Sequence, residues 1–271
     1  MKNLISRRNF LKATGLSVLA AGTASALTGC SSDKTDWETV QDNGYLTVGM
    51  TIFEPMNYYE NDVLVGYDTE LTQAVCAILG VEAVFQEIEW DNKVIELNGY
   101  SIDCIWNGMT KTDELAENID FSTPYSGNMQ VCVINSANAD LYTDLASINA
   151  AGVIVGAEAG SAGESVVESD IAAADLVSVA AQRDCLLELK SGTMDVGVMD
   201  YVMAAASIGD GTSYTDLMIV PDLELSKEEY AIGFRKGSDL TDLVNDALQQ
   251  LVDDGTVAAL VEKYPTVMSM L

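Results

Sequence analysis

The chain has 271 residues with 42 acidic and 13 basic side chains, so its formal net charge is −29, and it has no histidine. This charge excludes nucleic-acid binding, which requires a basic surface. The absence of histidine removes the commonest general base and metal ligand, so we expect no metal ion and no other cofactor.

The first 30 residues have the features of an export signal. A segment with two adjacent arginines, SRRNFLK, precedes a moderately apolar run, as in twin-arginine signals. Leu27, Gly29 and Cys30 resemble a lipobox, in which Cys30 becomes the lipidated first residue of the mature chain. The alternative is an ordinary secretory signal with a chance cysteine. We therefore expect a signal over 1–30, a tether over 31–36, and a lipid anchor at the outer face of the cytoplasmic membrane.

Strand-like and helix-like segments alternate through the first part of the mature chain. Strands are predicted over 45–50, 83–90 and 102–106. A helix with Asp68 or Thr69 as its N-cap follows the first strand and ends at Gly80, and another helix lies around 91–98. This alternation predicts a parallel sheet that helices cover on both faces.

The pattern restarts after residue 128. Strands are predicted over 130–135, 152–157, 176–180, 194–200 and 228–234. The segment SAGE, at 161–164, has the form of a capping box and opens a helix. Further helices are predicted over 182–190, over 201–208, from Leu240 to a stop at Gly255, and finally up to Tyr264.

These segments divide into two α/β lobes. The first lobe is expected to combine 37–128 with 229–271, and the second to contain 129–228. The chain would then cross between the lobes twice, near Asn128 and Glu229.

Four further cysteines lie in apolar surroundings, at positions 76, 104, 132 and 185. None forms a C-x-x-C pair, which argues against a zinc or iron–sulfur site. Export would permit disulfides, and the apolar surroundings are equally consistent with buried free thiols.

Ligands of open parallel α/β sheets bind beyond the carboxyl ends of the strands. The residues at those ends offer aromatic faces, hydroxyls, backbone N–H groups and carboxylates: Phe53, Glu54, Trp90, Asn107, Gly108, Met109, Thr110, Gly160, Ser161, Ala162 and Asp200. Such a set suits a small zwitterionic or cationic organic molecule. Each residue also has an ordinary structural alternative, since the aromatics could be core residues and Ser161 and Asp200 could be helix caps.

Eight phrases, in order, carry a resemblance to a known family: YLTVGM, LVGYDTELTQAVCAILGV, IEWDNKVIELNGYSIDCIWNGMTKTDE, IDFSTPY, VIVGAEAGSAGES, MDVGVMD, YAIGFRKGSDL and DDGTVAALVEKY. Through them the mature chain resembles the polar amino-acid-binding proteins of ABC importers. The resemblance implies a two-lobed type II periplasmic-binding-protein fold with a mixed, mostly parallel sheet in each lobe and a two-strand hinge. It also implies a monomer that captures a small polar solute between its lobes and delivers it to a membrane permease.

The resemblance assigns roles to the first-lobe residues. Phe53 and Trp90 match the walls around the ligand. Asn107 and Met109 match positions whose backbone carbonyl and N–H face the ligand, and Thr110 matches the hydroxyl that touches the α-carboxylate.

In the second lobe, Ser161 and Ala162 match the helix N-terminus that closes on the α-carboxylate, and Asp200 matches the anchor of the α-ammonium, a role suited to an ionised carboxylate. The sequence departs from the family at Leu115, where an arginine usually forks onto the α-carboxylate. Either the ligand is an amino acid held without that arginine, or it is a neutral or cationic amine that lacks a free α-carboxylate.

Two other classes are alternatives. An enzyme of the same fold, such as a cyclohexadienyl dehydratase or a lytic transglycosylase module, would need a placed acid or base, for which only Glu54 and Asp200 are candidates. A sensory receptor domain is the other alternative. We expect a binding protein rather than an enzyme.

Overall fold

The computed structural model describes residues 34–271. The predicted signal with its lipidation site at Cys30, and the first part of the tether, lie outside these residues. Helix α1, Asp36–Asn43, begins inside the predicted tether, because Thr35 accepts a hydrogen bond from the backbone N–H of Glu38 and so caps the helix. The tether therefore ends at Thr35, one residue earlier than predicted.

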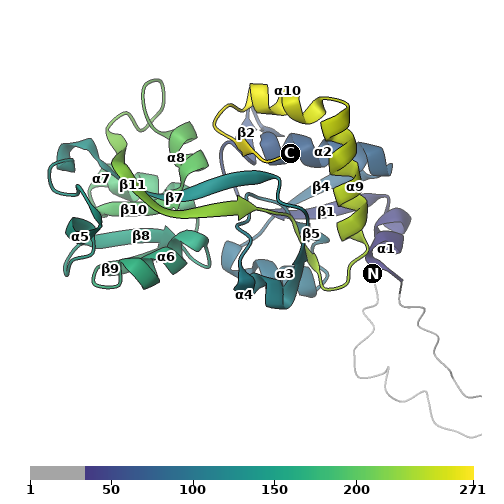
Figure 1. Cartoon of the computed structure of the whole chain (residues 1–271), viewed down its shortest axis with the longest axis horizontal. Helices are drawn as coiled ribbons and strands as arrows, with labels where there is room; N and C mark the ends of the chain where they lie inside the picture. The colour runs from purple at the N-terminus through teal and green to yellow at the C-terminus, as the bar shows by residue number, and fades with distance from the viewer. Residues whose placement is uncertain (1–33) are drawn as a thin grey trace, which may run out of the picture. The chain divides into compact units, whose positions relative to one another are not determined.

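The first lobe contains a five-stranded sheet (Figure 1). In spatial order its strands are β4 (Glu82–Glu87), β1 (Tyr45–Met50), β5 (Cys104–Ile105), β12 (Gly233–Arg235) and β6 (Ile119–Phe121). Strand β1 pairs in parallel with β4 and β5, and β12 pairs antiparallel with β5 and β6. The strands at the centre of this sheet are buried on both sides, as the alternation of strands and helices predicts.

Helices cover both faces of this sheet. Those that pack over one face are α2 (Tyr67–Leu79), α9 (Leu240–Asp253) and α10 (Thr256–Lys263). Those toward the other face are α3 (Lys93–Asn98), preceded by the short helix η2 (Trp90–Asn92), and α4 (Asp113–Asn118). The C-terminal helices α9 and α10 thus pack in the core of the first lobe, which supports the predicted assignment of 229–271.

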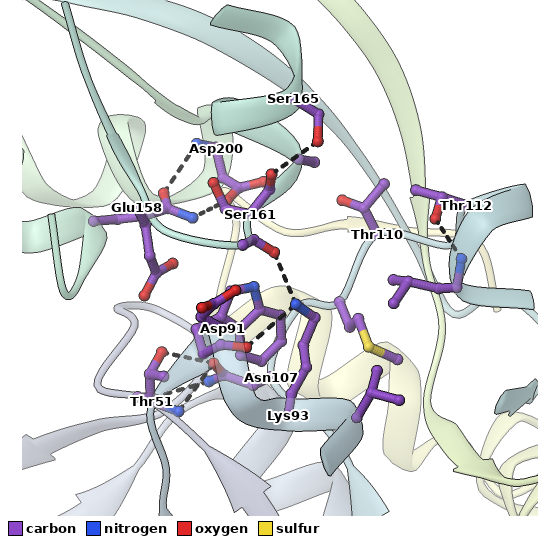
Figure 2. A pocket seen from close by; sticks show the side chains of 18 of the residues that line it. Thr51, Asp91, Lys93, Asn107, Thr110, Thr112, Glu158, Ser161, Ser165 and Asp200 are labelled. Carbon is purple, nitrogen blue, oxygen red and sulfur yellow. Dashed lines mark hydrogen bonds between the residues drawn. The ribbon is translucent and has the colours of Figure 1, made fainter. Parts of the chain in front are cut away.

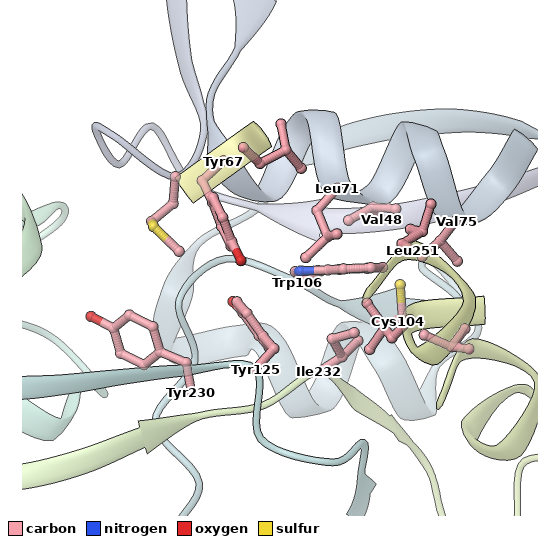
Figure 3. Close-up of a cluster of buried hydrophobic side chains, with 14 of the residues drawn as sticks. Val48, Tyr67, Leu71, Val75, Cys104, Trp106, Tyr125, Tyr230, Ile232 and Leu251 are labelled. Carbon is pink, nitrogen blue, oxygen red and sulfur yellow. The ribbon is translucent and has the colours of Figure 1, made fainter. Parts of the chain in front are cut away.

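Trp106 lies at the centre of the first-lobe core and is fully buried (Figure 3). It packs beside Tyr125, with ring centroids 6.2 Å apart, and Tyr125 stacks on Tyr67 at 6.4 Å. This large aromatic fixes the end of β5, so that the following residues Asn107 to Thr110 leave the core at a defined point.

The second lobe contains a six-stranded sheet. Its strands are β11 (Leu217–Tyr230), β7 (Ser126–Asn135), β10 (Val196–Asp200), β8 (Ile154–Glu158) and β9 (Asp175–Val179), with β13 (Met268–Ser269) pairing onto β7. Successive residues of β7 alternate between two hydrophobic clusters, Cys132 and Ile134 in one and Val131 and Val133 in the other. This period of two buries both faces of the strand.

Helices flank the second sheet. They are α5 (Leu145–Ile148), α6 (Ala162–Asp170), α7 (Gln182–Ser191) and α8 (Tyr201–Ser207). Three of them, α6, α7 and α8, begin within four residues of the end of a strand. The fold is therefore α/β with mixed sheets, as predicted. Antiparallel pairings take a larger share than a mostly parallel sheet would have. Strand β12 runs antiparallel to β5 and β6 in the first sheet, and β7 runs antiparallel to β10, β11 and β13 in the second.

The long strands β7 and β11 pair where the chain is predicted to cross between the lobes. Asn128 lies opposite Glu228, and Gly127 lies opposite Glu229. The last strand, β13, adds to this region, since Met268 pairs with Gly127. The lobe boundaries near Asn128 and Glu229 stay a prediction that this pairing supports, and three strands rather than two meet there.

Several local predictions differ from the structure. The predicted strand over 228–234 is two strands, and the first of them, β11, is 14 residues long and was not otherwise predicted. Strand β4 ends at Glu87, so Trp90 opens a short helix instead of ending a strand. Helix α2 begins after Gly66 without a side-chain cap, and Asp68 is buried inside the helix. A short hairpin, β2 (Tyr58–Glu60) and β3 (Val63–Val65), was not predicted.

Arg235 ties α1 to the first sheet. Its guanidinium is buried and lies 3.0 Å from the carboxylate of Asp36 and 3.4 Å from that of Asp103. It also donates to the carbonyl oxygens of Leu97 and Ile102, at 2.9 and 2.7 Å. A buried guanidinium needs this degree of satisfaction, because an unpaired buried charge costs several kcal/mol, about 3–5 when one partner is removed.

The four cysteines at positions 76, 104, 132 and 185 are free and buried. Burial raises the pKa of Cys76 and Cys132 to about 12. Of the two alternatives drawn from the sequence, the structure has the free thiols. Within residues 34–271, no helix has the length and apolarity needed to cross a membrane.

Candidate functional site

A cavity of about 560 Å³ is lined by residues of both lobes (Figure 2). Eleven of the twelve residues predicted for the ligand site line it: Phe53, Trp90, Asn107, Gly108, Met109, Thr110, Leu115, Gly160, Ser161, Ala162 and Asp200. The twelfth, Glu54, is exposed and is not among the lining residues. Its neighbour Phe53 turns inward, so the side chain at 54 turns to the surface.

The segment after β5 forms the first-lobe floor of the cavity. The side chain of Asn107 accepts hydrogen bonds from the backbone and hydroxyl of Thr51, at 3.0 and 2.8 Å, and donates to Asn57 at 2.7 Å. Gly108 donates its N–H to Asp68 at 2.7 Å. These bonds engage the side chain of Asn107 within the first lobe, so the role of its backbone toward the ligand, which the resemblance implies, stays a prediction.

Only glycine fits at position 108. Its φ is 55°, in the left-handed region, and a Cβ there would lie 2.5 Å from the ring of Phe53. Glycine therefore lets Phe53 press against the floor of the cavity and form part of its wall.

Thr110 and Leu115 lie in the wall on the same lobe. The hydroxyl of Thr110 donates to a carboxylate oxygen of Glu228 at 2.9 Å, so its proton is engaged by the protein. Leu115 packs against the apolar cluster that contains Met109 and lines the cavity. Position 115 thus faces the cavity with an apolar side chain, where the family's arginine would present a cation.

The N-terminus of α6 supplies the second-lobe wall. The hydroxyl of Ser161 accepts the backbone N–H of Glu164 at 3.1 Å and caps the helix. Glu164 reaches back to the N–H of Gly160, at 2.7 Å, rather than to that of Ser161, so only one half of the predicted capping box is present. Ser161 both caps the helix and lines the cavity. The first helical residue, Ala162, also lines the cavity.

Asp200 is 5 % exposed and accepts hydrogen bonds from four side chains. Its Oδ1 accepts from Gln130 at 2.9 Å, from the hydroxyl of Tyr230 at 2.8 Å and from Asn128, while Oδ2 accepts from Gln182. Asp200 occupies the N-cap position of α8, but its side chain makes no hydrogen bond to the N-terminus of that helix. Burial, followed by the charge of Glu228, raises the pKa of Asp200 to about 7.

Lys93 is a cavity residue that was not predicted. It is 6 % exposed, and its ammonium donates to the carbonyl oxygens of Trp90, at 3.2 Å, and Gly160, at 2.7 Å. The ammonium also lies 4.9 Å from the centroid of the Trp90 ring, within the range of a cation–π contact. Burial lowers the pKa of Lys93. Among the residues that the structure describes, it is the only basic side chain that lines the cavity.

Glu158 is a second cavity residue that was not predicted. It is the last residue of β8, one position beyond the predicted end of that strand, and it is 4 % exposed. Burial, followed by the charge of Asp200, raises the pKa of Glu158 to about 8. An acid directly after the apolar run VIVGA gave no signal of its own, because a glutamate at the end of a strand is ordinarily exposed.

Residues 46–267 match the model of the family described as "Bacterial extracellular solute-binding proteins, family 3". The arginine-binding extracellular protein ArtP of Bacillus subtilis is 29% identical over 257 residues, which cover 93% of this chain and 97% of that protein. The L-cystine-binding protein TcyJ of Escherichia coli is 29% identical over 228 residues, which cover 83% of this chain and 84% of that protein.

Solved structures give the same result. An amino acid ABC transporter substrate-binding protein of Streptococcus pneumoniae, bound to L-arginine, superposes with a TM-score of 0.77 at 26% identity, covering 88% of this chain and 100% of that one. The superpositions confirm the predicted two-lobed periplasmic-binding-protein fold. With a family model that spans 46–267 and relatives matched over most of their length, the chain belongs to family 3 of the bacterial extracellular solute-binding proteins.

Proposed function

We propose that this solute-binding protein captures an α-amino acid in the cavity between its lobes and delivers it to the permease of an ABC importer. The observation that carries the proposal is the buried carboxylate of Asp200, which faces the same cavity as the N-terminus of α6. An ammonium and a carboxylate on one small molecule complement these two features.

Asp200 has room for an ammonium group. A carboxylate offers about four lone-pair sites, two on each oxygen. Three donors approach Oδ1, whereas Oδ2 accepts only from Gln182. The free position on Oδ2 is therefore the place for the α-ammonium, and the four protein donors hold the carboxylate still while it binds.

Lys93 replaces the missing arginine in this proposal. Its ammonium is 2.7 Å from the carbonyl oxygen of Gly160, the residue directly before the cap of α6. A carboxylate at that helix end would meet a fixed cation as well as the helix dipole, which alone contributes only about 0.3–2 kcal/mol. Lys93 would bind it as a point charge, without the paired hydrogen bonds that arginine forms.

The proposal also includes the predictions on export and on the division into lobes. We infer a lipid anchor at Cys30, a monomer, and lobes formed by 37–128 with 229–271 and by 129–228. Labelling cells with a fatty-acid probe should mark the wild type and not Cys30→Ala. Equal labelling of the two would reject the anchor and leave the ligand assignment untouched.

An amine that lacks a free α-carboxylate is the second candidate ligand. The apolar Leu115 and the acids Asp91, Glu114, Glu158 and Asp200, which line the cavity with a single basic residue, favour it. Calorimetry with matched amino acids and their amides separates the two candidates.

For an amino-acid receptor, the acid should bind at least about tenfold more tightly than its amide. Leu115→Arg should increase this preference, because an arginine there would fork onto the carboxylate. Equal binding of acid and amide would reject the amino-acid assignment.

A further inference from the structure

Glu158 is a buried carboxylate whose Oε1 has no hydrogen-bond partner among the described residues. The side chain is 4 % exposed and lines the cavity. A buried anion without partners is costly, and proteins ordinarily satisfy such a group or pair it. Its position suits a group that arrives with the ligand.

The contrast with Asp200 sharpens this point. The two acids stand at the carboxyl ends of β8 and β10, which are adjacent parallel strands. Four side chains donate to Asp200, whereas Oε1 of Glu158 receives none. The protein's own donors therefore hold the carboxylate of Asp200 in place, whereas Oε1 of Glu158 remains available to a donor on the ligand.

The nearest cation does not neutralise Glu158 by contact. The ammonium of Lys93 is close enough to influence it, but it donates to Gly160 and Trp90, and no ion pair within 4 Å joins Lys93 to Glu158. The other charged groups that face Glu158 are Asp200 and Asp184, which add to the negative potential around it. The local field therefore favours a cation beside Glu158.

We propose that Glu158 binds a second cationic group of the ligand, a side-chain ammonium or guanidinium, so that the ligand is a basic amino acid. This inference rests on the proposed function and names its substrate class. Asp200 binds the α-ammonium, and Glu158 binds the side-chain cation from the neighbouring strand. The Trp90 ring, which lines the same cavity, offers a face on which a planar guanidinium can stack.

The test compares arginine with citrulline, which has nearly the same shape but an uncharged end. Calorimetry on the mature protein should give arginine an affinity at least about 30-fold higher than that of citrulline, because the charged end pairs with a buried carboxylate. In Glu158→Gln this ratio should fall to within about threefold. Glu168→Gln is the matched control, since it makes the same change at an exposed site on α6 and should keep the wild-type ratio.

The outcomes separate the two proposals. If glutamine, histidine or another amino acid binds but citrulline equals arginine in the wild type, the assignment of Glu158 is wrong and the receptor function stands. If no amino acid binds, both are wrong. If Glu158→Gln keeps the full preference for arginine, another group selects the cation. Circular dichroism checks that the variant folds, and a wild-type ratio near one rejects the assignment whether or not it does.

Discussion

The ammonium of Lys93 lies 2.7 Å from the carbonyl oxygen of Gly160, a residue 67 positions later in the chain. One hydrogen bond thus joins the start of α3 in the first lobe to the loop before α6 in the second. The same loop touches Asp91, because a Cβ on Gly160 would lie 2.8 Å from the Asp91 Cα. The two lobes meet at this side of the cavity through groups of the protein itself.

Replacing Lys93 with methionine should weaken ligand binding while keeping the apolar stem of the side chain. The ammonium would be missing both from the contact with Gly160 and from the carboxylate end of the cavity. We expect a loss of about 10- to 100-fold in affinity, measured by calorimetry. Lys111→Met is the control, since Lys111 is exposed and does not line the cavity. Equal losses in both variants would show that Lys93 acts only through overall charge.

Gly160→Ala should interfere with closure of the lobes. Gly160 has a φ of 68°, and its added Cβ would press on the Asp91 backbone. Gly152→Ala is a matched control, because Gly152 has a φ of 85° and nothing within 4 Å of its added Cβ. Both variants should lose about 1–2 kcal/mol in the free energy of unfolding through backbone strain.

Only Gly160→Ala should also bind ligand more weakly and show less compaction by small-angle scattering when ligand is added. Equal ligand affinities in the two alanine variants would mean that the contact with Asp91 forms no part of the closed state.

Asp200→Asn should nearly abolish binding. It removes the charge that pairs with the α-ammonium, and breaking a buried pair costs about 3–5 kcal/mol, or roughly 10² to 10³-fold or more in affinity. Calorimetry measures the loss, and a denaturant titration checks that the fold survives. A loss below about threefold would show that Asp200 organises Gln130, Gln182 and Tyr230 without touching the ligand.

The affinity for a basic amino acid should depend on pH near neutrality. The pKa of Glu158 is raised to about 8, so this carboxyl is protonated in much of the empty protein at pH 7. The ligand's cationic group pairs with the ionised carboxylate of Glu158, so binding is coupled to release of the proton from that carboxyl. Affinity should therefore fall as the pH falls below about 8, by up to about tenfold per pH unit. Calorimetry in buffers of different ionisation enthalpy should detect proton release, which Glu158→Gln should reduce.

The stability of the empty protein should change in the opposite direction. Glu158 and Asp200 have pKa values of about 8 and about 7 in the folded protein, above the values of 4.5 and 3.8 from which they are raised. Between pH about 4 and about 8, the folded state therefore binds more protons than the unfolded state. The free energy of unfolding should consequently fall as the pH rises through this range. Denaturant midpoints across this range check the slope. A flat profile would show that neither acid is perturbed.

Much of the site was predictable because strand ends carry their own signals. WNGMT combines a core aromatic with a glycine and polar groups, and the structure places Trp106 in the core and Asn107 to Thr110 at the cavity. Glu54 does not line the cavity, because the chain turns at this residue and leaves its side chain exposed, whereas Phe53 is buried in the cavity wall.

Lys93 and Glu158 were missed for a different reason. A lysine near a helix start and an acid after a strand ordinarily face solvent, so only the tertiary packing identifies these two as buried. The long strand β11 was missed because Pro221 and Asp222, whose φ is 57°, interrupt it, and its register with β7 shifts between Ile219 and Glu224. Its pairing with β7, and not its own sequence pattern, keeps it extended.

The four buried thiols can report which lobe of the molecule unfolds. Cys76 and Cys104 lie in the first lobe, on α2 and β5, and Cys132 and Cys185 lie in the second, on β7 and α7. Burial raises the pKa of each thiol, so almost no thiolate is present to react with an alkylating reagent until the surrounding core unfolds. Mass spectrometry of alkylated peptides would then time the melting of each lobe separately, while a rigid rotation of one lobe against the other would leave all four sites unmarked.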